Sequence, residues 1–65
     1  MKRYKVREVL DILKKDGWTI VGQKGSHRQL KNSKKKGKVT VNGKPSDDTW
    51  GAELSSIEKQ SGLIF

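Results

Sequence analysis

Apolar side chains recur at helical spacing near the start of the chain. Between residues 4 and 16 they come three or four positions apart, and most of the charged side chains fall on the opposite side. The apolar residues are Val6, Val9, Leu10 and Leu13. This spacing predicts an amphipathic helix from Tyr4 to Asp16. Gly17 is placed to end it, because glycine adopts the left-handed backbone of a helix C-cap at little cost.

The middle of the chain changes to the alternating pattern of extended strands. Residues 18–24, 27–31 and 38–42 are each predicted as a strand, although Leu30 is the only plainly apolar residue of the second run. Because successive side chains of a strand point to opposite faces, each run has one face for the core. In the first run this alternation puts Trp18, Ile20 and Gly22 together.

A second helical pattern lies near the end of the chain. Its apolar stripe consists of Trp50, Leu54 and Ile57. Residues 46–49 (Ser-Asp-Asp-Thr) offer side-chain oxygens for an N-cap and negative charge, which is favourable at the start of a helix. Gly62 is the predicted C-cap, and residues 63–65 are an apolar tail that we expect to fold back.

The predicted order of elements is therefore helix, three strands, helix. Short turns join the strands, at Gly25-Ser26 and in the polar segment 32–37, which favours an antiparallel meander. We predict an α+β fold of αβββα order, with a three-stranded antiparallel sheet and both helices on one face. No repeat or linker divides the sequence, so residues 1–65 are expected to form one domain.

Strand alternation also decides where the only histidine points. If Leu30 faces the core, then His27 and Gln29 lie on the solvent side, whereas Arg28 lies on the face opposite His27. An imidazole exchanges protons near neutral pH, and an exposed one in a basic protein suits proton transfer on a bound phosphodiester. His27 is therefore the candidate catalytic residue.

Charge narrows the choice of partner. Fifteen Lys and Arg against seven Asp and Glu give a formal net charge of +8, and the pI is about 10.1. So basic a domain favours a nucleic-acid partner, although an acidic protein would be attracted by the same field. The absence of cysteine excludes disulfides and thiolate metal sites. With no apolar run long enough for a signal peptide or a membrane span, we expect a cytoplasmic protein that does not bind membranes.

Several segments, in this order and at these spacings, resemble the HicA family of toxins. They are the first helix ending at Gly17-Trp18, then Gly25-Ser26-His27, Lys38-Val39-Thr40-Val41, Gly43-Lys44-Pro45-Ser46-Asp47-Asp48, Leu54-Ser55-Ser56-Ile57 and Gln60-Ser61-Gly62-Leu63. The resemblance covers nearly the whole chain. It implies an αβββα domain similar to the double-stranded-RNA-binding fold, a metal-independent mRNA endonuclease without a cofactor, and neutralisation by a HicB antitoxin.

Carried onto this sequence, the family's catalytic histidine falls on His27, and its glycine and serine fall on Gly25 and Ser26. Many members have a second histidine where this chain has Arg28, so a mechanism with two histidines as base and acid is not available here. The resemblance therefore implies a site with one histidine.

Cleavage of RNA through the 2′-hydroxyl needs a base, a positive group for the transition state and a donor to the leaving oxygen. His27 suits the first role. Arg28 or Lys24 suits the second, with Lys24 preferred because Arg28 lies on the opposite face. The donor to the leaving oxygen could be water, a lysine or Tyr4, and the sequence does not choose among them. The candidate substrate-binding residues are Lys24, Gly25, Ser26, Arg28, Lys34, Lys35 and Lys36.

Other residues have simpler structural interpretations. Trp18 and Trp50 could stack on bases, but their periodic placement favours anchors of the core. Asp47 and Asp48 are expected to cap a helix rather than to hold a metal. Two further functions stay open: a module that binds structured RNA without cleaving it, and an interaction protein whose basic face meets only an acidic partner.

Overall fold

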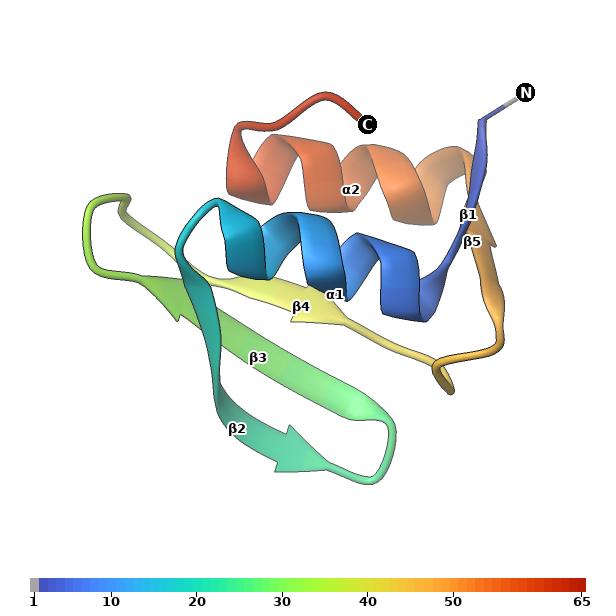
Figure 1. Ribbon diagram of the computed structural model, residues 1–65, viewed down its shortest axis with the longest axis horizontal. Coiled ribbons are helices and arrows are strands. Elements are labelled where there is room, and N and C mark those ends of the chain that lie inside the picture. Colours follow the sequence, from blue (N-terminus) through green and yellow to red (C-terminus); the bar gives the residue numbers. More distant parts are fainter. Residues whose placement is uncertain (1) are drawn as a thin grey trace.

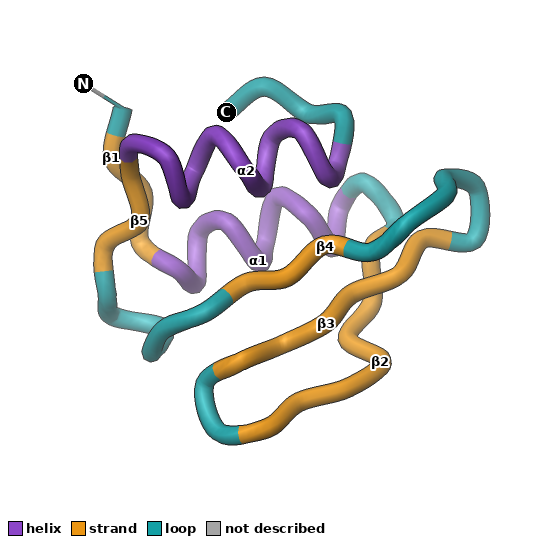
Figure 2. The backbone as a smooth tube through the Cα atoms, turned by 180° about the vertical axis from the view of Figure 1, so that it is seen from behind, coloured by secondary structure: helices purple, strands orange, loops and turns teal. Residues whose placement is uncertain are grey.

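The computed structural model describes residues 2–65 and shows two helices packed on one sheet (Figure 1). The elements are β1 (Arg3–Lys5), α1 (Val6–Lys15), β2 (Trp18–Lys24), β3 (His27–Asn32), β4 (Val39–Val41), β5 (Asp48–Trp50) and α2 (Gly51–Ser61). Strands β2, β3 and β4 form an antiparallel sheet in that order. Figures 1 and 2 show both helices on the same side of this sheet. The predicted α+β class, the three-stranded meander and the placement of both helices are confirmed.

The core lies between the helices and the inner face of the sheet. Every apolar position predicted for the first helix is buried, as are Leu54 and Ile57 of the second. The sheet contributes Trp18, Leu30, Val39 and Val41. Trp18 is fully buried, and its indole N–H donates a hydrogen bond to Asp16 Oδ2 at 3.1 Å, so the polar end of the ring is satisfied as well. The remaining face of the sheet is left open to solvent.

A second, two-stranded sheet was not predicted. Strand β1 pairs antiparallel with β5, so residues 3–5 are extended and α1 begins at Val6 rather than at Tyr4. The main chain explains this start, because Val6 N–H donates to Asp47 O at 2.8 Å and Lys5 N–H donates to Glu8 Oε1 at 2.8 Å. Glu8 thereby satisfies one of the amides that have no partner inside the helix.

The same pairing corrects the prediction for Trp50. This residue ends β5 and is the N-cap of α2, so none of residues 46–49 caps that helix. Trp50 is 48% exposed and does not anchor the core. Instead, the guanidinium carbon of Arg3 lies over its ring, 5.6 Å from the ring centroid. Asp47 stabilises the preceding turn, in which Lys44 N–H donates to its carboxylate at 2.9 Å.

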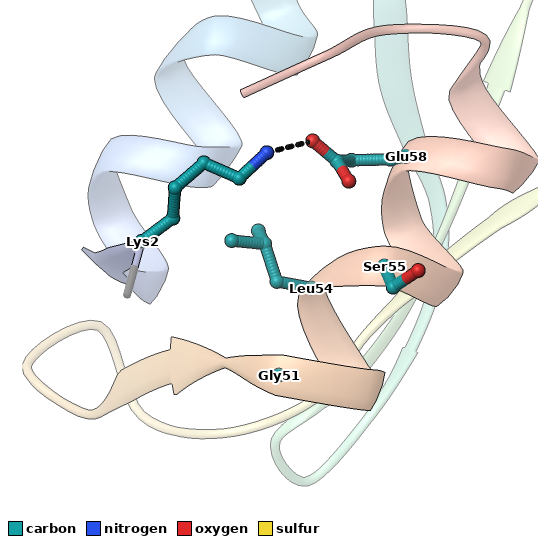
Figure 3. A pocket seen from close by; sticks show the side chains of 5 residues that line it. All are labelled: Lys2, Gly51, Leu54, Ser55 and Glu58. Carbon is teal, nitrogen blue, oxygen red and sulfur yellow. Dashed lines mark hydrogen bonds and ion pairs between the residues drawn. The ribbon is translucent and has the colours of Figure 1, made fainter.

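Gly62 is the C-cap of α2, as predicted, and the folded tail is confirmed, whereas the C-cap of α1 is Asp16 and Gly17 ends that helix one position further on. Gly17 and Gly62 both have positive φ just beyond their helices. In the tail, the ring of Phe65 packs edge-on against Tyr4 with centroids 5.7 Å apart. Phe65 N–H also donates to Glu58 Oε2 at 2.8 Å. Lys2 reaches the same carboxylate at 2.7 Å, so this side of α2 is tied to both ends of the chain (Figure 3).

A β-bulge in β2 overturns the simple alternation expected there. Ile20 pairs with Leu30, but Gly22 pairs with Gln29, so the extra residue lies between Ile20 and Gly22. Cross-strand partners share a face. Gly22 is therefore on the outer face with Gln29, and not on the core face with Trp18 as the sequence pattern suggested.

Candidate functional site

His27 occupies the first position of β3, beside the turn that joins it to β2. Its side chain is exposed on the outer face of the sheet, while the neighbouring Leu30 is fully buried on the helix side. The orientation expected from strand alternation is confirmed. Figure 1 shows this turn at the tip of a hairpin that extends away from the helices, so the imidazole is open to large ligands.

Lys24 lies directly across the hairpin from His27. The two residues are in register as the last pair of the β2–β3 ladder, and both are exposed. Without the bulge, Lys24 would share the buried face of Trp18, six residues earlier. The bulge therefore lets Trp18 stay in the core while Lys24 lies on the outer face with His27, in agreement with the preference for Lys24 as the neighbouring cation.

The two-residue turn between them has a defined shape. Gly25 has φ of +60°, whereas Ser26 has negative φ, and this combination belongs to the type II′ hairpin turn, which favours glycine first. Gly25 O accepts a hydrogen bond from Gln23 Nε2 at 3.1 Å. Ser26 O accepts one from Gly43 N–H at 3.2 Å, which joins this turn to the turn after β4.

Arg28 holds the same two turns together from the inner face. The residue is only 6% exposed. Its Nη1 donates to Ser26 O at 3.2 Å and to Gly43 O at 2.8 Å. Because these bonds go to main-chain carbonyls on the side away from His27, the guanidinium supports the turn from within, and Lys24 is the cation that shares the face of the imidazole.

The lysine run lies far from His27. It belongs to the loop after β3, at the opposite end of that strand and about 17 Å along it. Lys34 and Lys36 are exposed. Lys35 is exposed as well, but its ammonium donates to Asp16 Oδ2 at 2.7 Å and to Ser61 O at 3.2 Å, and so joins the C-terminal ends of both helices. A cation there is favourable, since the carbonyl end of a helix carries partial negative charge.

We expect Lys35→Ala to lower the thermal unfolding midpoint at pH 7, and Lys34→Ala and Lys36→Ala to stay within about 3 °C of the parent. The hydrogen bond from Lys35 lowers the pKa of Asp16 below its ordinary value. A carboxyl with a lowered folded pKa stabilises the protein above its unfolded pKa, near 4, and loses this contribution as the pH falls through the folded value. The gap between parent and Lys35→Ala should therefore narrow in circular dichroism melts as the pH falls below the unfolded pKa of Asp16, while the bond from Lys35 to Ser61 O keeps part of it. An unchanged gap would contradict the ion pair.

Tyr4, the possible proton donor, lies in β1. Figure 1 shows β1 beside the start of α2, whereas His27 opens β3 on the hairpin. The ring of Tyr4 is half-buried against Phe65. The structure therefore does not bring this hydroxyl to the imidazole, and water or a lysine remains for the leaving group.

The residues around His27 also form a hollow in the outer face. Its volume is about 440 Å³, and it is lined by Gly22, Gln23, Lys24, His27, Gln29 and Thr40. Sequence alternation had placed Gln29 beside His27, but it missed Gly22 because of the bulge. The isolated glycine inside a strand was the available signal. A second hollow of about 200 Å³ lies elsewhere, between Lys2 and α2, where the ion pair with Glu58 crosses it (Figure 3).

Among residues 2–65, no three His, Cys, Asp or Glu side chains gather as they would around a metal ion. Asp47 and Asp48 are used instead within the fold: Asp47 closes a turn, and Asp48 pairs with Lys5 at 2.9 Å. In the same part of the chain, neither helix is long and apolar enough to cross a membrane.

These features define a small basic α+β domain with one exposed imidazole on an open sheet. Comparison with family models finds a match over residues 6–63 to a family described as the HicA toxin of bacterial toxin–antitoxin systems. The match covers nearly the whole chain, so the protein belongs to the HicA toxin family, as its sequence motifs indicated. A search of curated proteins gave no match.

Proposed function

We propose that this toxin is an endoribonuclease that cleaves mRNA in the cytoplasm without a metal ion or cofactor, with His27 as its catalytic base. The observation that carries the proposal is the register of the hairpin, which presents His27 and Lys24 side by side on an exposed face. Membership of the HicA family supports the same conclusion. The net charge of +8 favours binding of a polyanion.

The chemistry follows from this pair. Neutral His27 takes the proton of a ribose 2′-hydroxyl, the 2′-oxygen attacks the adjacent phosphorus, and the bond from phosphorus to the 5′-oxygen breaks. The Lys24 ammonium neutralises charge on the phosphate oxygens as it develops. Water or a lysine protonates the departing 5′-oxygen. The products are a 2′,3′-cyclic phosphate and a 5′-hydroxyl.

Arg28 is assigned a supporting position rather than a phosphate contact. Its bonds to Ser26 O and Gly43 O fix the turn that carries His27. A guanidinium that left these carbonyls for a phosphate would give up the two part-buried hydrogen bonds by which it holds the turns together, which is costly. Gly25 and Ser26 likewise shape the turn, and the lysine run is a separate contact for RNA phosphates.

Product analysis tests the proposed reaction. Cleavage of an unstructured RNA by purified protein should proceed undiminished in excess EDTA and leave 2′,3′-cyclic phosphate and 5′-hydroxyl ends, which are identified by end-specific labelling. The same RNA with 2′-deoxyribose at the cleaved position should resist cleavage, because the nucleophile is missing. A requirement for Mg²⁺, or 5′-phosphate ends, would contradict the mechanism.

The antitoxin of this system is proposed to be an acidic, HicB-like protein that covers the outer face of the sheet. His27 is open to solvent, so inhibition requires a cover, and complementary charge speeds association. In hydrogen exchange, residues 24–28 should become protected when the antitoxin is added, whereas the buried amides of α1 should change little. Loss of activity with unprotected residues 24–28 would mean that inhibition acts elsewhere.

A further inference from the structure

Gly22 differs from the other glycines of this chain. Of the seven glycines, the six others have positive φ, a backbone conformation that favours glycine and accounts for its presence there. A Cβ built at Gly22 would meet nothing within 4 Å. Neither its own backbone nor a neighbouring atom therefore demands glycine. Glycine weakens the interior of a strand, and it marks either a bulge, which lies directly before Gly22, or a place where a ligand approaches closely.

The missing side chain opens the hollow beside His27. Pairing across the sheet puts Gly22 opposite Gln29, and Gln29 opposite Thr40 on the next strand. Gln29 thus stands between a glycine and a short hydroxyl side chain, with free space on the glycine side. His27 is two residues away on the same face, about 7 Å along the strand.

The lining indicates what the hollow can bind. Apart from Lys24 and His27, the polar side chains that this face offers are the Gln29 amide and the Thr40 hydroxyl. Gln23 also borders the hollow, but it pairs with Arg28 and its amide donates to Gly25 O. A glutamine amide has one donor and one acceptor side by side, and this pair matches N7 and the N6 amino group of adenine. That edge of adenine is out of reach in paired RNA, because the major groove of the A-form helix is deep and narrow. The base must therefore be unpaired.

We propose that the hollow over Gly22 is a nucleobase subsite that selects an unpaired adenine, read by the Gln29 amide. This subsite rests on the proposed function, since the adenine held there belongs to the nucleotide whose 2′-hydroxyl reaches His27. The substrate class is accordingly single-stranded RNA with adenine on the 5′ side of the cleaved bond.

The aromatic residues support reading by hydrogen bonds rather than by stacking. All four lie elsewhere: Trp18 is in the core, Trp50 is under Arg3, and Tyr4 packs against Phe65. Stacking on an aromatic ring tolerates any base, whereas recognition of a base edge discriminates among bases. The outer face should therefore bind selectively.

Binding of RNA that cannot be cleaved tests the subsite separately from cleavage. The probes are four pentanucleotides with two uridines on each side of a central A, G, C or U, and with every 2′-hydroxyl replaced by fluorine. Isothermal titration at low salt should show that the parent prefers the adenine probe over the other three by about tenfold. Gln29→Ala, an exposed change, should bind all four alike.

Gly22→Val fills the hollow with a residue that strands favour, so folding should be retained. It should weaken binding of the adenine probe and remove the preference. Thr19→Val is the matched control: it places the same side chain on the same strand and outer face, paired with Lys31 and outside the hollow. This control should keep the preference of the parent.

Equal affinity of the parent for all four probes would overturn the subsite, even if the protein cleaves RNA. Parent-like preference in Gln29→Ala or in folded Gly22→Val would also overturn it. A retained adenine preference in a protein that cleaves no RNA would instead uphold the subsite and reject the proposed function.

Discussion

Replacement of His27 by alanine is expected to lower RNA cleavage by about 10² to 10⁴-fold, the usual contribution of one positioned acid or base. The side chain is exposed and outside the core, so the thermal unfolding midpoint should stay close to that of the parent. RNA affinity should also persist, because the proposed phosphate contacts belong to lysines rather than to His27. Cleavage rates, melting curves and salt-dependent binding measured on one preparation separate these effects. Toxicity on expression in bacteria should disappear with the activity.

Thr19→Ala is the control for this experiment, since it truncates another exposed residue of the outer face that lies outside the hollow. It should cleave RNA at the rate of the parent. Full activity of His27→Ala would exclude the imidazole as the base. If the parent binds RNA but neither protein cleaves it, the fold is a binding module. If RNA fails to bind even at low salt, the basic surface serves an acidic protein partner instead.

Trp18→Ala should cost about 3 to 5 kcal/mol of the free energy of unfolding, the range for large aromatic side chains removed from a core. Trp18 is fully buried, and its indole is hydrogen-bonded to Asp16. Small domains have about 5 to 15 kcal/mol in total, and this one is at the short end of the size range. The variant should therefore be largely unfolded at 37 °C, as measured by far-ultraviolet circular dichroism in urea.

Trp50→Ala provides the matched comparison, because it removes the same side chain from a half-exposed site. There the indole contacts the guanidinium of Arg3, so the loss should be within about 1 kcal/mol. Similar losses for the two variants would show that Trp50 also anchors the core. A Trp18→Ala protein as stable as the parent would show that Trp18 does not.

The helices and the three-stranded sheet could be predicted because their patterns are local. Val9 and Leu13 fall on one stripe of α1 whatever they pack against, and Gly17 and Gly62 end their helices through their own backbone freedom. Leu30 likewise fixed the face of His27, since the two residues are three positions apart on β3 and successive side chains of a strand point to opposite faces. Family motifs depend on the same short spacings.

The β1–β5 pair could not be predicted in this way. Arg3 pairs with Trp50, far away in the sequence, and strands of three residues are too short to show a period. Trp50 fits a helical stripe in the sequence, but the extended pairing in the folded chain outweighs this local preference. The roles of Arg28 and Lys35 were hidden for the same reason, because their partners Gly43, Asp16 and Ser61 come from other elements.

The candidate site separates most clearly what the sequence determines from what only the tertiary structure decides. The sequence by itself determined that His27 lies at a hairpin turn and faces solvent, because both follow from a two-residue turn and strand alternation. The sequence also favoured Lys24 as the cation beside His27. Only the tertiary structure decided that Gly22 joins them, since the bulge that shifts β2 by one residue is defined by pairing with β3. A bulge changes the face of every residue beyond it. It can be recognised only from the pairing with the neighbouring strand, which the sequence of one strand does not show.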